Sequence, residues 1–134
     1  MPMPFLLVAA AATVAAASPA PPANPAIGTW SNPKGTLAVR TMPCGPALCG
    51  VVVRASPGAQ ADVQAAGGTR LVGTELLQDY RSTGPGSWAG RVFVPDMGRS
   101  FSSHLRQTAP DQLTISGCLV AGLFCRSQQW RRLP

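Results

Sequence analysis

The single histidine of the chain, His104, is the residue best suited to acid–base catalysis. It follows Ser103, and a serine–histidine–aspartate triad could be drawn with Asp96 as its third member. However, adjacent residues of a strand point to opposite faces, and no strand–turn–helix elbow surrounds the serine. A polar strand face in contact with water is the simpler interpretation of His104. We therefore expect no catalytic residues and a protein that is not an enzyme.

Metal and cofactor sites need several ligands at workable spacing, and the sequence does not supply them. His104 has no partner ligands nearby, and Glu75 and Asp79 are separated by the end of a predicted strand. No glycine-rich loop that could cradle a phosphate opens a helix. The sequence therefore predicts neither a metal ion nor a cofactor.

The four cysteines, Cys44, Cys49, Cys118 and Cys125, form an even set that indicates disulfides in an exported chain. Three pairings are possible. Each neighbouring pair flanks a short link, which favours the local bridges Cys44–Cys49 and Cys118–Cys125. Zinc is the alternative, but the spacings of four and six residues differ from the usual zinc knuckles. An oxidising compartment also disfavours zinc.

Glu75 is the most unusual charged residue, because it shares the face of a predicted strand with Leu71 and Leu77. A carboxylate on an apolar face must be paired or solvated inside a cavity. In a barrel it would be a polar anchor for a ligand, with Arg91 or Arg126 as its partner. The alternative is that the other face is buried and Glu75 lies on the surface.

Aromatic residues complete the candidate site and the candidate core. We assign Trp88 with Glu75 and Arg91 to a ligand site, although the core is the other interpretation of Trp88. Trp30 and Trp130 are expected to close one end of the fold. An arginine from a late strand would stack on the Trp30 ring.

The first 17 residues have the composition of a secretory signal peptide. They carry no charged side chain, and the apolar run 5–14 is too short to span a bilayer as a helix. Small residues at 15–17 predict cleavage after Ala17, so that Ser18 begins the mature chain. A single membrane anchor is the alternative. Residues 18–26 are rich in proline and are interpreted as an extended tether.

The net charge of +6 arises from 11 basic and 5 acidic residues. Ten of the basic residues are arginines, and they are dispersed along the chain rather than clustered among aromatic residues. We therefore expect no nucleic-acid partner. Attraction to anionic components of the cell envelope remains compatible with this charge.

Residues 27–134 are expected to form one domain, because 134 residues leave room for no second. The apolar pattern has a period of two rather than 3.6, and 14 glycines and 14 prolines interrupt it frequently. The predicted strands are 27–31, 36–42, 48–54, 70–78, 88–94, 99–107, 112–118 and 124–133. The loop 55–68 has room for a helical turn at 61–66. Sequential hairpins predict an all-β, antiparallel up-and-down barrel, with a sandwich as the competing architecture.

Several motifs resemble those of known families. The opening Gly28-Thr29-Trp30 resembles the Gly-x-Trp start of lipocalin-type barrels. The segments 43–50, 71–77, 90–96 and 117–130, which include both cysteine pairs, resemble secreted bacterial proteins of the domain-of-unknown-function family 2147. This resemblance covers residues 27–132. It implies an exported, lipocalin-like small β-barrel with no established activity.

Three functions compete at this point. The first is a non-enzymatic protein of the periplasm or extracellular space that binds a small apolar or amphipathic molecule in the barrel mouth. The second is a structural or interaction module of the cell envelope whose barrel is filled by side chains. The third, a hydrolase, lacks the residues that it would need. The sequence identifies neither a ligand nor an oligomeric state, and it predicts no membrane span after signal cleavage.

Overall fold

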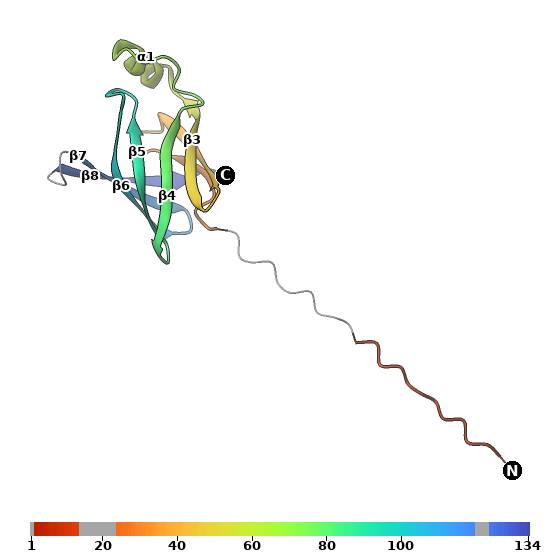
Figure 1. Cartoon of the computed structure of the whole chain (residues 1–134). Coiled ribbons are helices and arrows are strands. Elements are labelled where there is room, and N and C mark those ends of the chain that lie inside the picture. The colour runs from red at the N-terminus through yellow and green to blue at the C-terminus, as the bar shows by residue number, and fades with distance from the viewer. Residues whose placement is uncertain (1, 14–23, 120–123) are drawn as a thin grey trace.

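The computed structural model describes residues 2–13, 24–119 and 124–134. The described residues form eight strands and one helix: β1 (Gly28–Ser31), β2 (Leu37–Cys44), β3 (Ala47–Ala55), α1 (Pro57–Ala65), β4 (Glu75–Gly84), β5 (Ser87–Val94), β6 (Arg99–Ala109), β7 (Gln112–Leu119) and β8 (Phe124–Arg132). Each strand pairs antiparallel with the next, and β1 also pairs with β8. The sheet therefore closes into an up-and-down barrel (Figure 1), which confirms the predicted architecture over the competing sandwich.

The largest difference from the predicted strands is at β4, which begins at Glu75 instead of residue 70 and continues to Gly84. Before it, Gly73 adopts a positive φ of 93°, and the chain turns there with Leu71 already buried. Within β4 the register shifts between Gln78 and Arg81, and Asp79 has a φ of 51°. This bulge allows the strand to continue where the alternation of buried and exposed side chains is interrupted.

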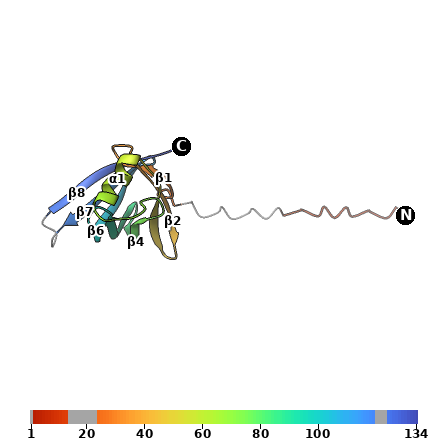
Figure 2. The same cartoon turned by 90° about the horizontal axis from the view of Figure 1, so that it is seen from above.

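The predicted single helical turn is a helix of nine residues, α1. Its N-terminus is fixed by Ser56, whose side chain accepts a hydrogen bond from the Ala59 amide at 3.1 Å, and by Pro57 in the first turn. One side chain of the helix, Val63, is buried and joins the core. Figure 2 shows the helix from above, lying over one end of the barrel.

Large side chains fill much of the barrel interior. Trp30, Tyr80, Leu105 and Leu113 are all almost completely buried. The Tyr80 ring lies against Gly90 of β5, where an added Cβ would come within 2.8 Å of the ring. The inward-facing glycine thus makes the space that the tyrosine occupies.

The two ends of the barrel differ because strand direction alternates. One end, the base, carries the hairpin turns after β2, β4 and β6, together with the segment 24–27. The opposite end, the mouth, carries the turn after β1, the helix α1 and the turn 95–98 (Figure 1).

The N-terminal residues 2–13 contain no regular secondary structure and extend away from the barrel (Figures 1 and 2). The expected cleavage site after Ala17 and most of the expected tether, 18–23, lie outside the described residues. The last part of that tether belongs to the barrel, because Ala26 is fully buried in the core. Among the described residues, no helix is long and apolar enough to cross a membrane.

Candidate functional site

The base of the barrel is sealed by the segment that enters β1. The indole nitrogen of Trp30 donates a hydrogen bond to the Ala26 carbonyl oxygen at 3.1 Å. The Thr41 hydroxyl of β2 donates to the same oxygen at 2.5 Å. Two donors on one buried carbonyl hold the entering chain across the end of the barrel.

Arg132 of β8 completes this seal. Its guanidinium carbon lies 4.4 Å from the centre of the Trp30 ring, which confirms the expected stacking of a late-strand arginine. The guanidinium also donates to the carbonyls of Ile27 at 2.8 Å, Pro110 at 3.0 Å and Pro25. A Cβ at Gly28 would collide with the guanidinium, so a larger residue there would displace Arg132 from this position. We call this closure the basal plug: residues 25–28, Trp30, Thr41 and Arg132.

The mouth, in contrast, contains a pocket with a volume of about 350 Å³. It is open to solvent and is bordered by the ends of β5, β6, β7 and β8 and by the turn that joins β5 to β6. We call it the mouth pocket, and its lining residues are Val92, Val94, Met97, Phe101, Ile115, Gly117, Arg126 and Gln128.

Strand alternation and register explain why these side chains meet. Val92 is opposite Phe101 between β5 and β6, and Ile115 is opposite Gln128 between β7 and β8. Deeper in the barrel lie the buried residues Trp88 and Leu113. Each is an even number of residues from a pocket residue of its own strand, Val92 or Ile115, so it points to the same inner face. The pocket therefore continues the inner face of the barrel beyond the last filled layer.

Two disulfides fasten hairpins at opposite ends. The structure joins Cys44 to Cys49 across the β2–β3 hairpin and Cys118 to Cys125 across β7 and β8, the pairing that the sequence favours. The second bridge is adjacent to the mouth pocket, because the next pair in the register is Gly117 with Arg126. The position of Arg126 is thus tied to a covalent crosslink.

The three expected ligand residues do not meet. Glu75 and Arg91 are exposed, on β4 and β5, and Trp88 is buried in the core. None of them lines the mouth pocket. Glu75 has the surface position that was the alternative interpretation of its strand. Of the two arginines named as possible partners inside the barrel, Arg126 is the one that lines the pocket.

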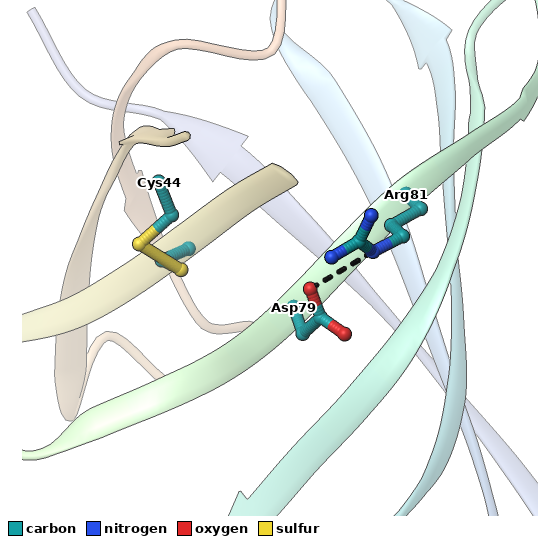
Figure 3. Close-up of polar contacts among 4 residues, drawn as sticks. Cys44, Asp79 and Arg81 are labelled. Carbon is teal, nitrogen blue, oxygen red and sulfur yellow. Dashed lines mark hydrogen bonds and ion pairs between the residues drawn. A yellow bond between two sulfur atoms is a disulfide. The ribbon is translucent and has the colours of Figure 1, made fainter. Parts of the chain in front are cut away.

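The surface beside the first disulfide carries the ion pair of the described residues, between Asp79 and Arg81 of β4 (Figure 3). The distance between Arg81 Nε and Asp79 Oδ1 is 3.1 Å, and both side chains are 63% exposed. Exposed pairs of this kind contribute little to stability.

The Glu75 carboxylate lies within 4.8 Å of the sulfur atoms of Cys44 and Cys49. Because the sulfurs are joined to each other, this group offers no thiolate to a metal ion.

The residues of the hypothetical triad are also separated. His104 is exposed on β6, whereas Ser103 is buried and its hydroxyl donates to the Ser116 carbonyl at 2.6 Å. Asp96 lies in the turn between β5 and β6. Opposite faces of one strand therefore separate the nucleophile from its base, as alternation predicts.

Tyr80 is the buried titratable group of the core. Burial raises the pKa of its phenol to about 12, and the Ser103 hydroxyl beside it lowers the pKa by less. Ser103 donates its proton to Ser116 instead, and within the described residues the Tyr80 hydroxyl has no hydrogen-bond partner. The ring thus fills the barrel at the cost of an unsatisfied polar atom.

Sequence reasoning missed the apolar wall of the pocket. Phe101 and Ile115 show the same period-two pattern as core residues, so the pattern predicts an inward direction. It does not predict where the filled layers end. That boundary depends on the volumes of Trp88, Tyr80 and Leu105 within the closed barrel.

Comparisons with known proteins agree with this architecture. The barrel is similar to the solved structure of protein HP1028 from Helicobacter pylori, which is described as belonging to the lipocalin family. The TM-score is 0.61 with 13% sequence identity, over 81% of this chain and 82% of the other. No curated protein matches the chain. The profile of uncharacterised proteins conserved in bacteria, DUF2147, matches residues 28–132, and the chain belongs to this family.

Proposed function

We propose that the protein is a non-enzymatic binding protein that holds a small apolar or amphipathic molecule in its barrel mouth. The observation that carries this proposal is the mouth pocket, an open volume of about 350 Å³ at the end opposite the basal plug. Pockets for small ligands have volumes of roughly 300–1,000 Å³ and mostly apolar walls. Six of its eight lining residues are apolar or glycine, which suits such a ligand.

We further propose that the protein is exported and acts in the periplasm or extracellular space. Two disulfides and no free cysteine among the described residues fit an oxidising compartment. The apolar composition of the first 17 residues supports a cleaved signal. Mass spectrometry of the exported protein should find Ser18, or a residue shortly after it, at the N-terminus. Retention of residues 1–17 in a membrane fraction would contradict export.

The experiment for the pocket uses a neutral amphiphile, 1-decanol, and a variant that fills the space. A Cβ at Gly117 would meet the Val92 side chain at 3.4 Å, an ordinary contact, so Gly117→Leu should place its side chain in the mouth pocket. We expect calorimetry to show binding of 1-decanol to the wild type and at least tenfold weaker binding to Gly117→Leu.

The matched control is Thr114→Leu, which adds the same side chain to the outer face of the same strand, β7. It should bind 1-decanol as the wild type does. Equal binding by all three proteins would place the ligand elsewhere. An absence of binding to the wild type would favour the alternative function, a structural or interaction module of the cell envelope. The side chains that fill the barrel below the mouth pocket support that alternative.

A further inference from the structure

The polar groups of the mouth pocket lie on one side. Arg126 and Gln128 are consecutive inward positions of β8, whereas Val92, Val94 and Phe101 form the facing wall on β5 and β6. A ligand in this pocket would meet a cation and an amide on one side and hydrocarbon on the other. The lining is therefore complementary to a molecule with one polar end.

Arg126 has no carboxylate partner within the described part of the chain. All five acidic residues lie in that part, and the ion pair found there is the one between Asp79 and Arg81. The remaining acids are in α1, at the start of β4 and in the turns after β5 and β6. The guanidinium is consequently available to an anion that enters from solution.

Gln128 has a fixed orientation that leaves a donor free. Its side-chain oxygen accepts a hydrogen bond from the indole nitrogen of the buried Trp130 at 3.1 Å. Because an indole nitrogen only donates, the amide oxygen must face it, and the amide NH₂ group points away from it. Within the described residues that NH₂ group makes no hydrogen bond, so the pocket has a second donor beside the guanidinium.

We propose that the mouth pocket binds a short-chain amphiphile with an acidic head group, a carboxylate. The carboxylate pairs with the Arg126 guanidinium, which can donate two parallel hydrogen bonds, and it accepts a further one from the Gln128 amide. The chain lies against Val92, Phe101 and Ile115. This inference rests on the proposed function and adds the chemical class of the ligand.

The volume limits the length of the chain. A water molecule occupies about 30 Å³ in the liquid, so a pocket of about 350 Å³ has room for roughly a dozen non-hydrogen atoms. Decanoate has a matching size, and 1-decanol offers the same chain with a neutral head group. The pair isolates the contribution of the acid.

The test compares the affinities of decanoate and 1-decanol by calorimetry at pH 7. Hydrogen bonds to charged groups should make decanoate bind about tenfold to a hundredfold more tightly to the wild type. Arg126→Gln should abolish this preference, so that decanoate and 1-decanol bind to the variant with similar affinities. Arg126→Lys retains the charge but not the paired donors, so it should keep only part of the preference.

The matched control is Arg91→Gln, which removes an exposed arginine of β5 that does not line the pocket. It should retain the full preference for decanoate. The assignment of Arg126 is overturned if Arg126→Gln keeps the preference or Arg91→Gln loses it. Equal affinities of the wild type for both ligands would reject the acidic head group and leave the binding function standing. Binding of neither ligand would reject the proposed function itself.

Discussion

The base and the mouth of this barrel are built from the same eight strands of the described chain, yet an arginine at each end has very different contacts. At the base, Arg132 lies on an indole ring and donates hydrogen bonds to three carbonyls. At the mouth, Arg126 projects from the same strand, β8, and is exposed without an ion pair in the described residues. Arg132 is satisfied by groups of the fold, whereas Arg126 is the residue that we propose pairs with a ligand carboxylate.

The difference indicates how a small barrel can combine stability with an open site. A chain of this size buries a limited core, and the plug concentrates aromatic and hydrogen-bonded groups at one end. The opposite end can then remain unfilled without loss of the fold. Changes at the base should therefore alter stability, and changes at the mouth should alter binding.

The largest expected effect is that of Trp30→Ala. Removing a fully buried indole with its hydrogen bond and its stacked arginine should lower the free energy of unfolding by about 3–5 kcal/mol. Phe101→Ala removes a half-buried ring from the pocket wall and should cost about 1 kcal/mol. Urea unfolding midpoints measure both. Equal losses would show that the mouth carries as much of the stability as the base.

The two disulfides provide an intermediate effect. Replacing either cysteine pair with serines opens a loop of a few residues and should cost about 2–2.5 kcal/mol in both cases. Ligand affinity should separate them, because Arg126 is adjacent to Cys125 and remote from the Cys44–Cys49 bridge. We expect weaker decanoate binding only without Cys118 and Cys125. If both double variants lost the same affinity for decanoate, binding would depend on the base as well as on the mouth, contrary to this prediction.

Tyr80 gives the smallest effect at neutral pH, and it tests the core between the two ends. Tyr80→Phe removes a buried hydroxyl without a hydrogen bond in the described residues, so stability at pH 7 should stay equal or rise by about 1 kcal/mol. The folded pKa of about 12 exceeds the usual value of 10.0. The wild type should therefore lose stability as the pH rises from 10 to 12, by at most ~1.4 kcal/mol per pH unit, and Tyr80→Phe should not show this component.

The same residue allows a direct measurement, because Tyr80 is the only tyrosine in the chain. Tyrosinate absorbance should titrate near pH 12 in the folded protein and near pH 10 in the urea-unfolded protein. A folded midpoint near 10 would mean that water reaches the phenol.

Much of the fold could be predicted from the sequence because the information is local. Alternation and turn residues predicted the hairpin of β5 and β6, which turns at Pro95. The short links between neighbouring cysteines predicted the two disulfide bridges. The start of β4 could not be predicted in this way. Leu71 has the apolar character of a strand residue, but it packs into the core from a turn at Gly73.

The site was harder to predict than the fold for a related physical reason. Whether Glu75 faced the cavity or the surface depended on the register shifts between β3 and β4, which bring Val51 opposite Glu75 and Gly50 opposite Leu77. A shift of one residue reverses the direction of a side chain. Arg126 has no such shift in its pairing with β7, so alternation alone predicts its inward position.

The plug also has a consequence for the order of assembly. It joins Arg132 to Ile27, two residues 105 positions apart. The strand pairing that closes the barrel, between β1 and β8, joins residues about 100 positions apart. Neighbouring hairpins can form as soon as their own residues meet, because closing a short loop costs little entropy. The ring, however, cannot close before β8 is available. The domain therefore completes its fold in a single long-range step that depends on its last strand, and that step is expected to set the folding rate.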